Sequence, residues 1–352
     1  MKDMIEIQGK YTDAKIYTFT VQKGKMHTFT IPESYKSDAY ILEEQRTDQM
    51  RGVHVTSNYP ISLYASNYGP SSYDATMVLP TSTLGQEYVI QTFSKDRNAT
   101  EFAIVAINNS TKIWVTPTTA TTKGNSETSP ITNVSLSEGE VYLVRSASPT
   151  GDLSGTTIYA NKNVAVFSGN QTAIVPYSPA YTDDHVFEQA IPLRFWGQQF
   201  AVTTAALQKY NYVRVTAIYD NTEVLCNGTL ATVLAKNETY QMRVDNSAWI
   251  TTSRPTACYI YLSSAAVNDI VDLPDGNIVQ YGDPSMALIT PMEQGLNDLN
   301  FTAFKVVDPD SIKEAERSQI PMQHYVNVVT ATSAVSSMLL DGVSQAALFT
   351  PL

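Results

Sequence analysis

The chain has 352 residues, of which 43% are hydrophobic and 16% charged, and its formal net charge is −11. This length suffices for two or three domains with packed cores, and an aromatic content of 10% argues against a disordered chain. The negative charge argues against a nucleic-acid partner and against docking on anionic lipid, because both need a basic surface. No apolar run reaches the roughly 18 residues of a membrane span, so membrane insertion is not expected.

In chain order, almost every predicted element is a β-strand. Alternating or β-branched stretches begin near residue 101 and recur to the C-terminal end, at 101–107, 112–116, 141–145, 163–167, 199–205, 212–218 and 325–331. The stretch 305–323, rich in Glu, Lys and Arg, predicts a helical connector that ends at Pro321. The fold class predicted is therefore all-β.

One pattern occurs three times along the chain. Residues 55–67, 158–170 and 250–262 align without a gap, with an aromatic residue at the same offset in each: Tyr64, Phe167 and Tyr259. Self-similarity at a period of about 100–110 residues indicates repeated structural units.

Turn residues support the same alignment. Gly24, Gly139 and Asn237 occupy one position of the repeat, and Gly and Asn tolerate the positive φ of a tight turn. Asn227-Gly228 and Asp341-Gly342 follow alternating apolar residues, which is a strong hairpin signal. We therefore expect equivalent turns in equivalent places.

These patterns predict three β-sandwich-like units. Two are continuous, at 102–205 and 212–304, and the third is completed jointly by the two ends of the chain, 17–93 and 325–352. Pairing of the two ends would hide open sheet edges. A six-bladed β-propeller, with two blades per repeat, is the alternative.

Candidate contact residues lie downstream of each repeated strand. Asp74, Asp184 and Asp283 align, which is typical of a turn or strand edge and would place similar loops around one body. The stretch 66–75 adds Tyr68 and Tyr73, whose rings combine apolar area with a hydrogen-bonding tip. We interpret these five residues as ligand-contact candidates, with sheet-end packing of the tyrosines as the alternative.

Catalytic motifs are not recognised in the sequence, and neither a cofactor nor a metal site is expected. The densest polar cluster, at 183–189, contains Asp184 and Glu188, and such carboxylates are the groups used by carbohydrate-active enzymes. Because the acidic position is repeated in every unit, we favour a structural role and predict no enzyme activity.

Two further residue types bear on the compartment. Cys226 and Cys258 fall in one unit at inward-facing positions, where they are either two small buried residues or a disulfide. Asn-x-Ser/Thr sequons, the acceptors of N-glycosylation, favour an extracellular or cell-surface protein and stand at Asn98, Asn108, Asn109, Asn133, Asn170, Asn227, Asn237 and Asn300.

Several motifs together resemble one known family, the domain named for the N-terminal region of the IgG Fc-binding mucus protein. They cover most of the chain from about residue 50 to 345 and include "GVHVTSNYPISLYASN", "LPTSTLGQEY", "NVAVFSGN", "DHVFEQAIPLRFWGQQFAVTTA", "YGDPSMALITPMEQ" and "YVNVVTATSAVSSMLLDG". The resemblance implies an extracellular binding or adhesive module of large secreted and surface proteins, without enzyme activity. Fc binding itself does not carry over, because no Fc-contacting surface is identified.

The sequence thus favours a non-catalytic extracellular binding or adhesion module, part of a larger secreted, surface or matrix protein. Its expected partner is a protein or glycan ligand, or other extracellular components with which it assembles. The alternatives are a structural component of a filament, matrix or viral particle and, less favoured, a carbohydrate-active enzyme.

Overall fold

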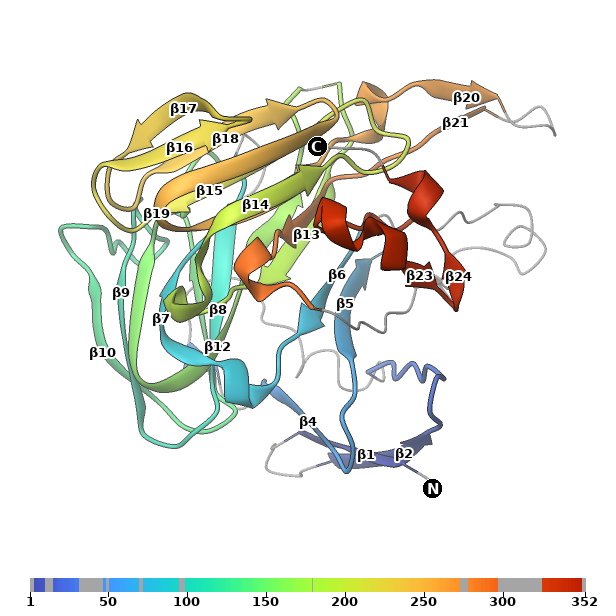
Figure 1. Ribbon diagram of the computed structural model, residues 1–352. Coiled ribbons are helices and arrows are strands. Elements are labelled where there is room, and N and C mark those ends of the chain that lie inside the picture. The colour runs from blue at the N-terminus through green and yellow to red at the C-terminus, as the bar shows by residue number, and fades with distance from the viewer. Residues whose placement is uncertain are drawn as a thin grey trace.

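The computed structural model describes residues 3–9, 15–31, 47–48, 51–69, 72–94, 99–178, 180–272, 278–296 and 325–349. Within these ranges the elements are β-strands and short 3-10 helices, so the predicted all-β class is confirmed (Figure 1). The expected helical connector 305–323 lies outside the described residues.

Two large sheets form the body of the molecule. The first sheet has the order β10-β9-β12-β8-β11-β3, and β7 and β13 also pair with β12. Its strands are β3 (Thr47–Asp48), β7 (Gly85–Val89), β8 (Thr100–Ala106), β9 (Thr111–Thr116), β10 (Ile131–Leu136), β11 (Val141–Arg145), β12 (Thr157–Ala173) and β13 (Asp184–Gln189).

The second sheet repeats this topology. Its order is β17-β16-β19-β15-β18, and β14 and β22 also pair with β19. Its strands are β14 (Gly197–Thr203), β15 (Asn211–Ala217), β16 (Thr222–Cys226), β17 (Thr229–Leu234), β18 (Thr239–Val244), β19 (Ser247–Leu262) and β22 (Ser285–Leu288). Each sheet holds seven or eight strands, whereas a propeller blade has four, so the propeller alternative does not describe them.

The remaining described strands form small sheets. A three-stranded sheet has the order β2-β1-β4, and there are three hairpins, β5–β6, β20–β21 and β23–β24. Their bounds are β1 (Asp3–Gly9), β2 (Lys15–Val21), β4 (Val53–Ser57), β5 (Leu63–Gly69), β6 (Ser72–Val78), β20 (Ile270–Asp272), β21 (Ile278–Gln280), β23 (Leu339–Leu340) and β24 (Val343–Ser344). Because β23 and β24 pair with each other here, joint completion of a unit by 17–93 and 325–352 stays a prediction.

Strand register supports a third copy of the repeat. In the hairpin β5–β6 Tyr64 lies opposite Met77, as Phe167 lies opposite Gln189 and Tyr259 opposite Leu288, which places the repeated aromatic at the same pairing position each time. The predicted boundaries are offset from the sheets by one strand. The strand β7 lies inside the predicted unit 17–93 but pairs with β12, and β14 lies inside the predicted unit 102–205 but pairs with β19. Each long strand therefore pairs with a strand from the end of the preceding predicted unit.

The predicted turns are confirmed by backbone angles. Gly24, Gly139 and Asn237 have φ values of +72°, +84° and +64°. Asn227-Gly228 joins β16 to β17 and Asp341-Gly342 joins β23 to β24, with all four residues at positive φ. Equivalent turns therefore occur where the repeat places them.

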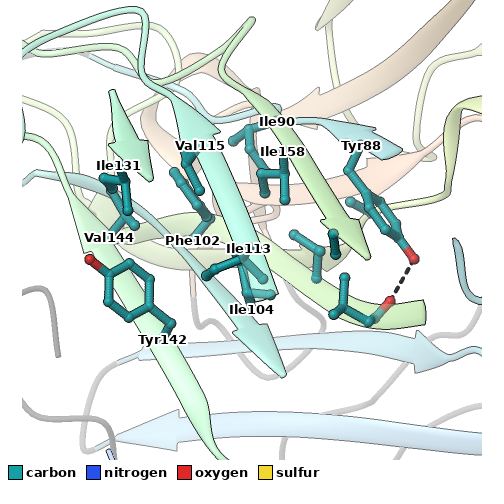
Figure 2. Packing of buried hydrophobic residues seen from close by; sticks show 14 of the residues in the cluster. Tyr88, Ile90, Phe102, Ile104, Ile113, Val115, Ile131, Tyr142, Val144 and Ile158 are labelled. Atoms are coloured by element: carbon teal, nitrogen blue, oxygen red, sulfur yellow. Dashed lines mark hydrogen bonds between the residues drawn. The ribbon is translucent and has the colours of Figure 1, made fainter. Parts of the chain in front are cut away.

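Each large sheet curls around its own core, as a sandwich does. The core of the first sheet contains Phe102, Ile104, Ile113 and Val115, whose side chains converge in Figure 2. The most deeply buried phenol of this core is satisfied, because the Tyr88 hydroxyl donates to the carbonyl of Val164 at 2.7 Å. The core of the second sheet is built from β14, β15, β16, β17, β18 and β19.

A third apolar cluster joins the two sheets. It brings Phe93 and Val186 from the first half together with Tyr259, Tyr261 and Met286 from the second half. Beside it the buried Arg214 of β15 forms an ion pair with Asp152, with 2.7 Å between Nη2 and Oδ2. This pair and the cluster hold the two sheets as one body.

Candidate functional site

The three repeated acidic segments meet at one place, which we call the junction: β6, β13 and β22. Asp74 of β6 is only 5% exposed, and its carboxylate accepts hydrogen bonds from both other strands. Oδ1 accepts from the Ser285 hydroxyl at 2.9 Å, and Oδ2 accepts from the backbone N–H of Phe187 at 3.0 Å and of Met286 at 3.4 Å. One carboxylate therefore ties three strands together.

Asp184 has a similar role one strand away. It is 3% exposed, and Oδ1 accepts from the backbone N–H of Tyr73 at 2.9 Å and of His185 at 2.7 Å. The structure does not favour the interpretation of Asp74 and Asp184 as ligand contacts: both side chains are buried, and both carboxylates accept hydrogen bonds from the chain's own backbone. The alternative, a structural role at the strand edges, fits them better.

Glu188 completes the carboxylates of the junction. Its Oε1 accepts from the hydroxyl of Thr76 and from the N–H of Gln189, and its Oε2 accepts from the N–H of Leu288 at 3.4 Å. Burial raises the pKa of Glu188 to about 7 and that of Asp74 to about 6. The hydrogen bonds to each carboxylate lower its pKa, but by less than burial raises it. Both groups thus titrate close to neutral pH.

The other three candidates lie around the junction. Asp283 is exposed at one side, and partial burial together with the carboxylates of Asp184 and Asp183 raises its pKa to about 7. Tyr73 is half-buried, and its backbone pairs with that of Tyr68 at the end of the hairpin β5–β6. The side chain of Tyr68 lies outside the described residues, so a contact role for the two tyrosines stays a prediction.

The junction makes stability depend on pH. A carboxyl group whose pKa is higher in the folded state binds more protons there, so its stabilising effect is present at low pH and lost as the pH rises through the folded pKa. For Glu188 this window runs from 4.5 to about 7, and for Asp74 from 3.8 to about 6. His185 acts in the opposite sense, because burial lowers its pKa.

We expect Glu188→Gln to flatten the pH dependence of the unfolding temperature between pH 5 and pH 8, since the amide does not ionise. Thermal unfolding of both proteins across this range measures the effect. Glu223→Gln, at an exposed position of β16, is the matched control and should keep the wild-type slope. Equal slopes for wild type and Glu188→Gln would show that Glu188 does not titrate in this window.

Proline turns link each repeat to the next. Pro80, Pro192 and Pro291 each precede a 3-10 helix, and a glycine follows the first two helices by two residues and the third helix by one. These glycines are Gly85, Gly197 and Gly295. A Cβ on Gly85 would lie 2.6 Å from Cβ of Pro192, and a Cβ on Gly197 would lie 2.2 Å from Cβ of Pro291. The glycine of one repeat therefore packs directly on the proline of the following repeat.

Cys226 and Cys258 are both free thiols in the structure. Cys258 is fully buried in the core of the second sheet, where burial raises the pKa of its thiol, and Cys226 packs against the same core. The alternative of small buried residues fits Cys258 best, and no disulfide joins the two.

The sequons differ in accessibility. The structure argues against glycosylation at Asn170, which is only 1% exposed. Its side chain accepts a hydrogen bond from the N–H of Phe93 and donates one to the carbonyl of Phe93, so a glycan has no room there. Asn237 is half-buried, and Asn98 and Asn300 lie outside the described residues. Exposed side chains, which are compatible with glycosylation, are those of Asn108, Asn109, Asn133 and Asn227.

The sequence did not indicate an aromatic pair on the first sheet in which Tyr159 is exposed and Trp114 is half-buried. Trp114 of β9 lies opposite Tyr159 of β12, with 5.4 Å between ring centroids, and Tyr159 is 47% exposed. Glu87 of β7 is the cross-strand neighbour of Tyr159 on its other side, and the exposed Lys112 precedes Trp114 by two residues. We call Trp114, Tyr159, Glu87 and Lys112 the aromatic row.

The second sheet has no such pair at the equivalent place, where Leu225 lies opposite Thr251. A comparison of the repeats could have found the row, because Trp114 and Tyr159 replace an aliphatic and a polar residue. Large aromatic side chains exposed on a sheet face are enriched at protein interfaces. The row is therefore a candidate surface for ligand contact among the described residues.

Residues 74–352 match the family model described as IgGFc binding protein. The chain is also 33% identical over 168 residues to the IgGFc-binding protein of Homo sapiens. That match covers 47% of this chain and 3% of the human protein, so the chain corresponds to a small part of the length of this relative. The family expected from the sequence motifs is confirmed. No helix among the described residues is long and apolar enough to cross a membrane.

Proposed function

Because the chain belongs to the IgGFc binding protein family, we propose that it is a non-catalytic binding module of a secreted or surface protein. Family membership is the observation that carries this proposal. The related human protein is named for binding IgG Fc, and we extend a protein ligand of this kind to the present chain. The junction carboxylates, which an enzyme would need free, instead accept hydrogen bonds from backbone N–H groups.

We further propose that the aromatic row contacts the ligand. Two rings in contact give a rigid apolar area at a small entropic loss, and flanking groups of opposite charge give orientation. Hot spots of protein interfaces are enriched in Trp and Tyr for this reason. The hairpin end with Tyr68 and Tyr73 stays a second candidate surface, and assembly with other extracellular components stays the alternative function.

Binding of immobilised IgG Fc and Fab fragments by the purified chain tests the function. Although the sequence alone identifies no Fc-contacting surface, the name of the human relative makes IgG Fc the first protein ligand to test, and we expect saturable binding to Fc and none to Fab. Absence of binding to Fc would contradict this expectation. Turnover of a glycan or peptide substrate that Glu188→Gln abolishes would refute the non-catalytic proposal.

The double variant Trp114→Ala/Tyr159→Ala tests the surface. Because both rings lie on the outward face of the sheet, we expect binding to weaken at least about tenfold, as for hot-spot residues, with an unchanged unfolding temperature. Leu230→Ala, at a 55% exposed position of β17, is the control and should bind as wild type does. Wild-type affinity in the double variant would rule out the aromatic row.

A further inference from the structure

The turn between β16 and β17 carries one of the exposed sequons. Asn227, Gly228 and Thr229 form the Asn-x-Thr sequence, and all three residues are exposed. Asn227 and Gly228 have φ values of +50° and +79°, and a Cβ on Gly228 would meet nothing within 4 Å. The asparagine therefore stands in a tight turn with open space next to it.

Hydrogen bonds fix the side chain of Asn227. Its backbone N–H donates to the carbonyl of Trp249 at 2.8 Å, and its Oδ1 accepts from the N–H of Trp249 at 2.8 Å. In a regular ladder the carbonyl of Asn227 would accept that second bond, so the side chain replaces it. Among the described residues Nδ2 of Asn227 has no hydrogen-bond partner, and Nδ2 is the atom to which an N-linked sugar is attached.

A hollow lies beside this asparagine. It has a volume of about 460 Å³ and is lined by Asn227, Gly228, Ser247 and Trp249. Sites that hold small molecules have volumes of roughly 300–1,000 Å³. The hollow therefore has room for a single sugar ring attached to Asn227.

Trp249 gives the hollow an aromatic wall. Its neighbours on β19, Ala248 and Ile250, are buried, so the indole lies on the opposite, outward face of the sheet, where it is half-buried. Trp114 stacks on Tyr159, whereas no ring among the described residues stacks on Trp249. The face of an indole is broad, apolar and negatively polarised, and the C–H groups of a sugar ring pack well on such a face.

We propose that Asn227 carries an N-linked glycan whose first N-acetylglucosamine lies in the hollow and stacks on the indole of Trp249. The donor is an oligosaccharide on a lipid diphosphate. Nδ2 loses one proton and forms a bond to C1 of the sugar, and the lipid diphosphate leaves from C1. This inference rests on the proposed function in one respect, since N-glycans are added to chains that enter the secretory pathway.

Glycopeptide mass spectrometry of the chain secreted from animal cells tests the modification. We expect a glycan on Asn227 in most molecules of the wild type and of Thr229→Ser, which keeps the sequon, and none in Thr229→Ala. Thr229 is the residue to change, because Asn227→Gln would also disturb the bond to Trp249. An unmodified Asn227 in the secreted chain would overturn the proposal, and this result does not depend on whether the chain binds IgG Fc.

Unfolding temperatures test the contact with the indole. Thr229→Ala should lower the unfolding temperature of the secreted chain by about 2 °C and leave that of the chain made in bacteria, without glycans, unchanged. In a Trp249→Ala background the same change should have no effect on the secreted chain, because the sugar has no ring to stack on. Equal losses in the two backgrounds would refute the stacking.

Trimming the glycans gives a measurement that needs no variant of Trp249. An endoglycosidase that leaves only the first sugar is applied to the secreted wild type and to secreted Thr229→Ala. The difference of about 2 °C between them should persist, since the hollow holds the first sugar alone. Loss of this difference on trimming would show that the outer sugars stabilise the chain and would overturn the proposed seat.

Discussion

Gly197→Ala is expected to lower the free energy of unfolding by about 3 kcal/mol, because the added methyl overlaps a rigid proline ring. Its carbon would lie 2.2 Å from Cβ of Pro291 and 2.9 Å from a carboxylate oxygen of Glu293. The ring cannot rotate away, so the two repeats must separate. Denaturant unfolding of the variant and the wild type measures the loss.

Gly295→Ala is the control, because Gly295 also follows a proline turn, although it directly follows its 3-10 helix whereas Gly197 stands one residue further on. A Cβ on Gly295 would meet only the carbonyl oxygen of Met292 at 3.4 Å, which is ordinary contact. The control should therefore stay within about 0.5 kcal/mol of wild type. Equal losses for the two glycines would show that the contact between Gly197 and Pro291 does not hold the repeats together.

Asp152→Asn is expected to cost about 3 kcal/mol, because it leaves the guanidinium of Arg214 buried without a counter-charge. Besides Asp152, this guanidinium donates to the carbonyl of Thr92 and to the hydroxyl of Ser154 at 3.1 Å. Burial raises the pKa of Asp152, but the charge of Arg214 lowers it more, and the net pKa lies below the ordinary value. The carboxylate is thus ionised at neutral pH and paired across the two sheets.

The exposed pair Arg243–Asp245 provides the control. Its side chains are 52% and 57% exposed, so Asp245→Asn should change stability by at most about 1 kcal/mol. In Asp152→Asn/Arg214→Met no unpaired charge is left, and part of the stability should return. If Asp152→Asn and Asp245→Asn had equal effects on denaturant unfolding, the buried pair would not join the sheets.

Local chemistry made much of the fold predictable. Alternation of apolar and polar residues predicts the strands β8, β9 and β15. Gly139 and Asn237 predict turns that need positive φ. The repeat also predicted that equivalent aromatic residues such as Tyr64 take equivalent places in the sheets. These features depend on neighbours within one or two strands, which a sequence pattern records.

The junction and the ligand surface were less accessible to sequence analysis. Asp74 is repeated along the chain, but its burial depends on Phe187 and Met286, which lie more than one repeat away. The ion pair of Arg214 with Asp152 likewise joins residues that no periodicity connects. An acidic residue in a predicted loop was interpreted as exposed because the convergence of three strands is a property of the tertiary structure.

Hydrogen exchange of the chain with and without its protein ligand tests the central claim, that this is a binding module whose contact surface is the aromatic row. With IgG Fc as the probe, we predict slower exchange in residues 111–116 and 157–161, and unchanged exchange in residues 222–226 at the equivalent place of the second sheet. No change anywhere in the chain at saturating Fc, or protection confined to the second sheet, would contradict the account.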